Sequence, residues 1–199
     1  MKQFAVVILA AGSSSRMGSP KQLLAHKGST FLEHTIQTAR HVFGENIFLV
    51  LGANAGFILD KIHTSSVHII INDHWEHGMG SSIAVGLDKA IEIMPDLSAV
   101  MFMTIDQPYI NAEHLRDIVS RCVESGKPIV ASGYKGTAGI PAMFDKKFFP
   151  GLLNLDGDKG AKEIIKLHPD STTLVPLAFG EIDIDTPEQY AALKQRENK

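Results

Sequence analysis

Two cations follow a loop of small residues near the start of the chain. The segment Leu9–Gly12 (LAAG) ends an apolar run, three serines come next, and Arg16 and Lys21 follow at short spacing. Small side chains let backbone N–H groups approach a polyphosphate, a guanidinium binds phosphate through two nitrogens, and an ammonium adds a point charge. The spacing fits neither the phosphate loop G-x-x-x-x-G-K-[ST] nor the dinucleotide pattern G-x-G-x-x-G. We interpret the loop as a phosphate-binding site; the alternative is a flexible connector whose cations face water.

Carboxylates occur at two other places where a metal ion could be held. Asp106 comes two residues after an apolar run that ends at Thr104, and a carboxylate at the end of a strand is well placed for Mg²⁺. Near the C-terminus, alternation along an extended segment puts Asp183 and Asp185 on one side. The alternatives are a turn aspartate at 106 and a cap of the final helix by Asp185 or Thr186.

Glycine-rich segments are further candidates for contacts with a ligand. Asn72–Ser82 leads from a predicted strand into a helix, so Gly78, Gly80 and the neighbouring serines can expose backbone N–H groups to a base or a phosphate. The later segments Gly136–Phe144 and Leu155–Lys162 fit an acceptor-binding loop, but they fit solvated surface equally well. The residues alone leave these two interpretations open.

The composition is that of an ordinary globular chain. It has 199 residues, of which 44% are hydrophobic and 21% charged, and a net charge of −3. A single cysteine, Cys122, excludes an internal disulfide framework and a four-cysteine zinc site and favours a reducing compartment. The charge balance gives no global reason to expect nucleic acid or anionic membrane as a partner, and the stretch Ala5–Ala11 is too short to span a bilayer. We therefore expect a soluble, cytoplasmic protein that binds neither nucleic acid nor membrane.

Apolar runs of strand length alternate with helical patterns along the first part of the chain. Continuous apolar runs predict buried strands at Ala5–Ala10, Ile47–Leu51, Val67–Ile71 and Ala99–Thr104. Helical periodicity predicts helices at Thr30–Phe43, Ser81–Met94 and Asn111–Glu124. This alternation predicts an α/β fold, in which helices cover both faces of a mostly parallel central sheet. Ligands of such sheets bind beyond the carboxyl ends of the strands, which here are the loops after Ala10, Leu51, Ile71 and Thr104.

The pattern changes after Lys127. Shorter strands are predicted at Pro128–Ser132, Ile140–Phe144 and Thr172–Pro176, with a glycine-rich connector at Gly133–Gly139. Helices are predicted near Asp145–Leu153, near Lys159–His168 and from Thr186 onward. No linker composition divides the chain, so we expect one domain, residues 1–199, with this last part as a lobe grafted on the sheet.

Together these motifs resemble the MobA-like nucleotidyltransferase family and, within it, the molybdenum cofactor cytidylyltransferases. The resemblance covers nearly the whole chain through LAAGSSSRMGSPKQLL (9–24), GMGSS (78–82), DQP (106–108), GIP (139–141), GDKGA (157–161) and DIDTPEQY (183–190). Members that transfer guanylyl groups tend to have a second glycine where Ala11 stands, so this chain is similar to the cytidylyl type. The resemblance implies a Rossmann-like three-layer α/β/α fold, with a nucleotide-binding part at about 1–127 and an acceptor-binding part at about 128–199.

The implied reaction joins CTP to the phosphate of molybdopterin and releases pyrophosphate. The family implies Mg²⁺ as the metal, with Mn²⁺ as the alternative. The product is the cytosine dinucleotide cofactor of molybdenum hydroxylases such as xanthine dehydrogenases, which the resemblance implies as client partners. The alternatives are a sugar- or alditol-phosphate nucleotidyltransferase and a non-catalytic cofactor-binding chaperone.

The resemblance also implies roles for individual residues. Arg16, Lys21 and Asp106 would be catalytic, with the two cations on the triphosphate. Asp106 and Asp185 would hold the metal, and Asp183 is a weaker candidate. The implied nucleotide-binding residues are Leu9, Ala10, Ala11, Gly12, Lys21, Asn72, Gly78, Gly80, Ser81 and Ser82. The implied acceptor-binding residues are Gly139, Pro141, Asp158 and Gly160.

Overall fold

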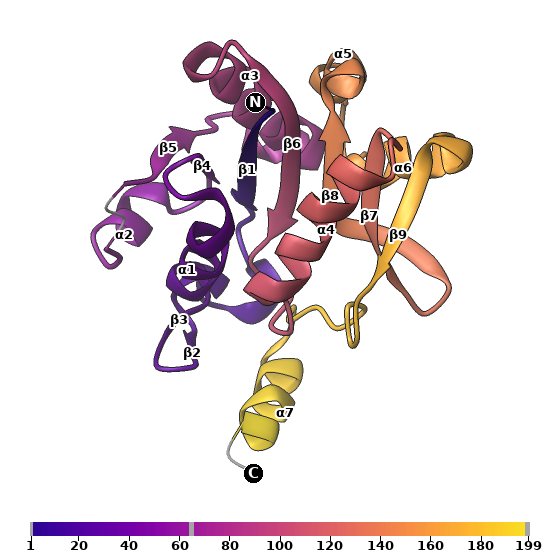
Figure 1. Cartoon of the computed structure of the whole chain (residues 1–199). Helices are drawn as coiled ribbons and strands as arrows, with labels where there is room; N and C mark the ends of the chain where they lie inside the picture. The colour runs from indigo at the N-terminus through magenta and orange to yellow at the C-terminus, as the bar shows by residue number, and fades with distance from the viewer. Residues whose placement is uncertain (1, 64–65, 198–199) are drawn as a thin grey trace.

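A seven-stranded sheet forms the centre of the protein (Figure 1). The computed structural model describes residues 2–63 and 66–197. In spatial order the strands are β5 (His68–Ile71), β4 (Ile47–Leu51), β1 (Gln3–Ala10), β6 (Leu97–Thr104), β8 (Thr137–Asp145), β7 (Ile129–Tyr134) and β9 (Thr172–Pro176). A separate two-stranded hairpin consists of β2 (Ala25–His26) and β3 (Ser29–Thr30).

The sheet is mostly parallel, as predicted. Strands β5, β4, β1 and β6 run parallel to one another, and β9 runs parallel to β7. Only β8 is antiparallel to its neighbours β6 and β7. The four parallel strands therefore bring the loops that follow them to one edge of the sheet.

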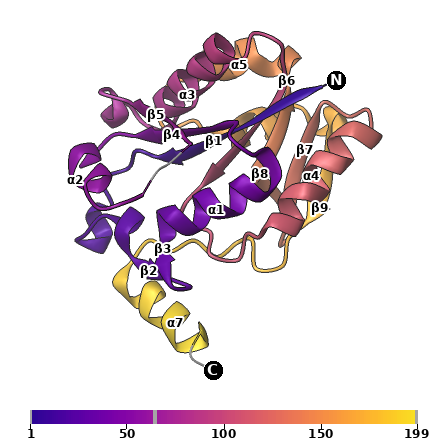
Figure 2. The same cartoon turned by 60° about the vertical axis from the view of Figure 1, so that its left-hand side comes forward.

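Helices cover both faces of the sheet, which confirms the three-layer α/β/α arrangement (Figure 2). On one face α1 (Phe31–Phe43) and α4 (Ala112–Glu124) pack against Val6 and Ile8 of β1. On the other face α3 (Met79–Ile93), α5 (Phe149–Leu153) and α6 (Ala161–Leu167) pack in a cluster that includes Ala5 and Val7. The remaining helices are α2 (Ala55–Leu59), α7 (Pro187–Glu197) and the short 3-10 turns η1 (Ser15–Met17), η2 (Lys21–Leu23), η3 (Trp75–His77), η4 (Lys146–Phe148) and η5 (Pro169–Ser171).

Local signals explain where two of the predicted helices begin. The Thr30 side chain accepts a hydrogen bond from the backbone N–H of Glu33, whose carboxylate accepts from Thr30 N, so α1 opens with a capping box. The Asn111 side chain accepts from the backbone N–H of His114 at the start of α4, as its N-cap position predicts. Among the described residues, no helix combines the length and the apolar character that crossing a membrane requires.

The predicted glycine-rich connector at Gly133–Gly139 is wrong. Strands β7 and β8 continue into this segment, and only Lys135 and Gly136 form the turn between them. Both turn residues have positive φ, 44° and 73°, which is the conformation of a tight two-residue hairpin turn. Gly139 lies within β8, and a Cβ at this position would overlap the Tyr134 hydroxyl. Its glycine reflects a close approach and not a flexible loop.

We expect Gly86→Ala to destabilise the protein, because Gly86 lets α3 approach the sheet closely. A Cβ at this position would lie 2.6 Å from Val7 Cγ1 and 2.8 Å from Val50 Cγ2, and both valines are fully buried. Overpacking costs about 1–3 kcal/mol and helix propensity offsets about 1 kcal/mol of that cost, so we expect the free energy of unfolding to fall by up to about 2 kcal/mol. Urea denaturation followed by circular dichroism measures it.

The matched control is Gly56→Ala in α2. No atom lies within 4 Å of a Cβ at this exposed position, so the substitution should be neutral or slightly stabilising. Equal stability of the Gly86→Ala and wild-type proteins would contradict the close-packing argument.

Candidate active site

The loops at the carboxyl ends of β1, β5 and β6 surround a cavity of about 520 Å³, here called the first cavity. Its floor is formed by residues 9–14, and its sides by the segment after β5 and by the end of β6. The lining residues are Leu9, Ala10, Ala11, Gly12, Ser13, Ser14, Lys21, Gln22, Trp75, Glu76, Gly78, Met79, Ser82, Thr104, Ile105, Asp106 and Asp158. The cavity thus lies at the edge of the sheet where the topology predicts a ligand.

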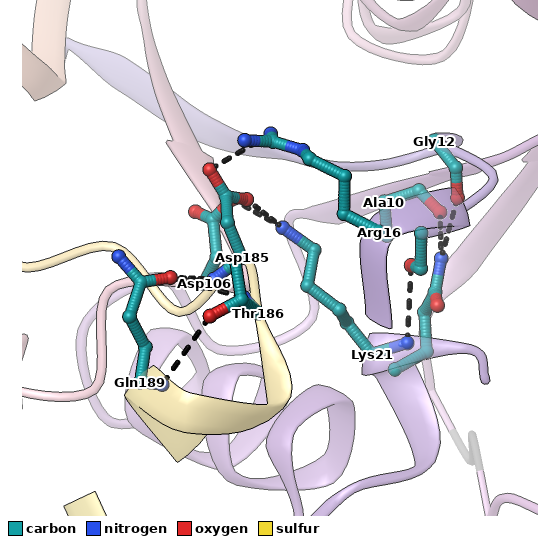
Figure 3. Close-up of polar contacts among 10 residues, drawn as sticks. Ala10, Gly12, Arg16, Lys21, Asp106, Asp185, Thr186 and Gln189 are labelled. Carbon is teal, nitrogen blue, oxygen red and sulfur yellow. Dashed lines mark hydrogen bonds and ion pairs between the residues drawn. The ribbon is translucent and has the colours of Figure 1, made fainter. Parts of the chain in front are cut away.

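Four charged side chains converge beside the first cavity (Figure 3). Lys21 Nζ lies 3.0 Å from Asp106 Oδ2 and 2.7 Å from Asp185 Oδ1. The Arg16 guanidinium lies 2.9 Å from Asp185 Oδ2. Only 16% of the Lys21 side chain is exposed, whereas 70% of Arg16 is. The two cations and two carboxylates singled out from the sequence are therefore neighbours, and Lys21 is the group that joins them.

Burial and neighbouring charges shift the pKa values of Lys21, Asp185 and Asp183. Burial alone would lower the pKa of Lys21, but the charges of Asp106 and Asp185 and the hydrogen bonds to both outweigh it, and the pKa is raised. Burial alone would raise the pKa of Asp185, but Lys21 and Arg16 lower it overall. Asp183, which is close to the other two carboxylates, has a pKa raised to about 6 by burial and by their charges. Near neutral pH the cluster therefore contains a charged Lys21 beside an ionised Asp185.

The same geometry fits a divalent cation. Asp106 and Asp185 both contact one Nζ, so their oxygens face a common point that already favours positive charge. Carboxylate oxygens are the ligands that Mg²⁺ and Mn²⁺ prefer. No group of three or more His, Cys, Asp or Glu side chains in the described part of the chain could hold a metal. The two carboxylates would then be the protein's share of the ligands, as is common for Mg²⁺ that also binds substrate phosphates.

The loop after β1 offers main-chain donors to an anion. In the described structure, the N–H groups of Gly12, Ser13 and Ser14 have no protein acceptor. The loop folds back on η2, where the backbone N–H of Lys21 donates to Ser14 Oγ at 3.1 Å. Successive free N–H groups in such a turn form a concave anion site, which fits the predicted phosphate loop.

The segment 72–82 forms one wall of the first cavity. The buried Asn72 side chain donates to Ser81 Oγ at 2.9 Å and to Ser82 Oγ at 3.0 Å. Gly78 has a φ of 92°, and a Cβ there would overlap the backbone of Gly157. Of the predicted residues in this segment, Gly78 and Ser82 line the cavity, whereas Asn72, Gly80 and Ser81 support its wall from behind.

A second cavity of about 310 Å³ adjoins the first, and the two share the lining residues Leu9, Met79, Thr104, Asp106 and Asp158. Asp158 and Gly160, two of the residues that the resemblance implies for the acceptor, line it. Gly139 and Pro141 do not: Gly139 lies against the Tyr134 hydroxyl, and the Pro141 carbonyl accepts from Ser132 Oγ at 2.7 Å. Both contribute to the sheet behind the cavity.

Sequence reasoning missed several lining residues of both cavities. Gln22 and Gln107 are almost fully buried and directly follow Lys21 and Asp106, so their position next to predicted site residues was an available signal. Tyr134 reaches the second cavity only because the β7–β8 hairpin carries it there, and no local pattern marks it.

Comparisons with known proteins agree with this site. The model of the MobA-like NTP transferase domain matches residues 6–172. Nicotine blue oxidoreductase of Paenarthrobacter nicotinovorans is 29% identical over 94% of both chains. Purine catabolism protein PucB of Bacillus subtilis (strain 168) is 30% identical over 95% of both chains. A probable molybdenum cofactor guanylyltransferase of Rhodopirellula baltica is 32% identical over 62% of this chain and 58% of its own.

Solved structures show the same architecture. Rv0371c of Mycobacterium tuberculosis H37Rv superposes with a TM-score of 0.83 and 27% identity, covering 98% of this chain and 99% of its own. Its complex with manganese superposes with a TM-score of 0.77 and 26% identity over the same shares of the two chains. The matched domain spans most of the chain and includes the phosphate loop and Asp106. This chain therefore belongs to the MobA-like NTP transferase family and is a nucleotidyltransferase.

Proposed function

We propose that this protein transfers CMP from CTP to the phosphate of molybdopterin and releases pyrophosphate. The observation that carries the proposal is the convergence of Arg16, Lys21, Asp106 and Asp185 where two cavities adjoin. Joining two anionic reactants requires that their charges be neutralised and their phosphates aligned, and this cluster has both signs of charge at the boundary. The relative from Rhodopirellula baltica, which is named for the molybdenum cofactor, supports this acceptor. Ala11 in the loop LAAG supports CTP as the donor.

In this reaction a phosphate oxygen of the acceptor attacks the α-phosphorus of CTP. A new P–O bond forms, the bond to the β-phosphate oxygen breaks, and pyrophosphate leaves. Lys21 and Arg16 neutralise charge on the leaving group, and the N–H groups of residues 12–14 bind phosphate oxygens. A divalent cation held by Asp106 and Asp185 would supply further charge neutralisation. The acceptor phosphate is already ionised near neutral pH, so we assign no general base.

In this proposal different parts of the chain bind the two substrates. Residues at about 1–127 form most of the nucleotide site and residues at about 128–199 most of the acceptor site. The residues that line both cavities come from both parts and lie at the boundary: Leu9, Met79, Thr104, Asp106 and Asp158. Mg²⁺ or Mn²⁺ is the metal, and the manganese complex of Rv0371c supports a metal of this kind. The product serves a cytoplasmic molybdenum hydroxylase such as xanthine dehydrogenase; PucB, named a purine catabolism protein, supports this client.

A pyrophosphate-release assay tests the reaction. CTP, GTP and ATP are each combined with molybdopterin, with a sugar phosphate and with an alditol phosphate, and the products are identified by mass spectrometry. We expect release with CTP and molybdopterin at a higher kcat/KM than in any other pair. Release only with a sugar or alditol phosphate would favour that class of acceptor. Tight cofactor binding without release of pyrophosphate would favour a non-catalytic chaperone.

We expect Asp106→Asn to remove most turnover without unfolding the protein. Asp106 contacts Lys21 and lines both cavities, so the substitution removes a charge from the point where the reactants meet. Loss of one such contact to a transition state lowers kcat by roughly 10²–10³-fold. Fixed-time pyrophosphate assays measure the loss of turnover, and circular dichroism shows whether the fold is retained. Asp88→Asn, at an exposed position on α3, is the matched control, and near-normal kcat in Asp106→Asn would refute the assigned role.

Lys21→Met should separate turnover from metal binding. Lys21 occupies the point that the two carboxylates face, so its removal should lower kcat by at least about 10²-fold while Mn²⁺ binding to the protein alone becomes equal or tighter. Electron paramagnetic resonance of free Mn²⁺ measures the binding without substrates. If the variant instead changed only thermal stability, Lys21 would be a structural lysine.

A further inference from the structure

Gln22 lies beneath the loop after β1 and is 2% exposed. Its side-chain nitrogen Nε2 donates to the carbonyl of Ala10 at 2.7 Å and is 3.3 Å from the carbonyl of Gly12. One amide group therefore bridges two carbonyls at the start of the loop. Gln22 follows Lys21 in η2, so this short turn carries one side chain to the carboxylates and the next beneath the loop.

These two hydrogen bonds determine the direction of the loop's donors. In a trans peptide the C=O and the following N–H point to opposite sides. With the carbonyls of Ala10 and Gly12 turned toward Gln22, the N–H groups of Ala11 and Ser13 are turned away from it. The Ala11 carbonyl accepts a hydrogen bond from the backbone N–H of Ala53 at 3.0 Å. This contact orients the peptide that joins Ala11 to Gly12.

The other end of the Gln22 side chain is not satisfied. Its oxygen Oε1 is buried and has no hydrogen-bond partner within the described residues. An unbonded buried amide oxygen costs free energy, and an apolar side chain of similar size would avoid that cost. The amide is therefore poorly explained by stability, and what it provides at this position is the pair of bonds to the loop.

We propose that Gln22 is a positioning residue for the nucleotide. By holding the carbonyls of Ala10 and Gly12, it keeps the N–H groups of Ala11 and Ser13 directed at the phosphates of the bound triphosphate. The inference rests on the proposed function only in requiring that a nucleoside triphosphate binds in the first cavity. Gln22 acts through the backbone and contacts no reacting atom.

The test compares Gln22→Met, which keeps the length of the side chain and removes the donor, with the wild-type protein. We expect Kd and KM for CTP to rise about tenfold or more, since hydrogen bonds to charged phosphate are weakened, while kcat and KM for the acceptor change less than about twofold. Titration calorimetry with inorganic tripolyphosphate should show the same weakening, because the donors act on phosphate and not on the base. Gln22→Asn, which is too short to bridge both carbonyls, should act in the same direction and serves if Gln22→Met does not fold.

Gln107→Met is the matched control. Gln107 is also buried, also donates to a loop carbonyl, that of Gly180 at 3.0 Å, and also has an unpartnered Oε1 among the described residues, but it lines the second cavity. Its substitution should leave the Kd for CTP within about twofold when no acceptor is present.

The outcomes separate the inference from the proposed function. If the wild-type protein binds none of CTP, GTP and ATP, the proposed function fails. If the wild-type protein binds CTP and Gln22→Met binds it equally well, the positioning role is overturned. Equal weakening in the Gln22 and Gln107 variants would also overturn it, since general loosening would then explain the loss.

Discussion

A buried ammonium between two carboxylates is the interaction on which the rest of the site depends. Asp106 and Asp185 face one point, and two ionised carboxylates so arranged repel each other unless a cation lies between them. Lys21 is that cation in this structure. All three side chains are less than one-third exposed, so water and salt screen these charges less than they would on the surface. Each segment around the site can be understood by how it places one of these three groups.

The C-terminal helix α7 places Asp185. The Gln189 side chain accepts hydrogen bonds from the backbone N–H groups of Asp185, at 2.8 Å, and Thr186, at 3.0 Å, and thereby caps the helix. The Tyr190 hydroxyl donates to the carbonyl of Ala25 at 2.8 Å, which ties α7 to the segment that follows Lys21. Beneath these contacts, a small apolar cluster joins the helix to the phosphate loop and α1 through Met17, Phe31, Ile184 and Leu193. The helix extends away from the sheet, yet its first turn lies at the site (Figures 1 and 3).

Local patterns in the sequence were sufficient to predict the parallel strands and to single out the charged residues that cluster at their ends. Continuous apolar runs predicted the parallel strands, and the loops at their ends contained Lys21 and Asp106. Composition misled at the β7–β8 hairpin, because glycines that permit close approach within a sheet look like glycines of a loop. The bridging position of Lys21 depends on distances between three loops far apart in the chain, and Tyr134 depends on hairpin register. Residue types alone specify neither.

The family match covers residues 6–172, whereas contacts in the structure connect the residues after 172 to the site. The family match ends at residue 172, so Asp185 and α7 lie outside it, and contacts such as those of Asp185 with Arg16 and Lys21 link them to the site. The relatives that span nearly the whole chain have names from different areas of metabolism. More than half of the residues that line the second cavity come from the β7–β8 hairpin and from residues 158–163. Those residues can therefore differ between relatives while the charged centre at Asp106 stays the same, and under the proposed reaction the second cavity would be the place where the choice of acceptor is determined.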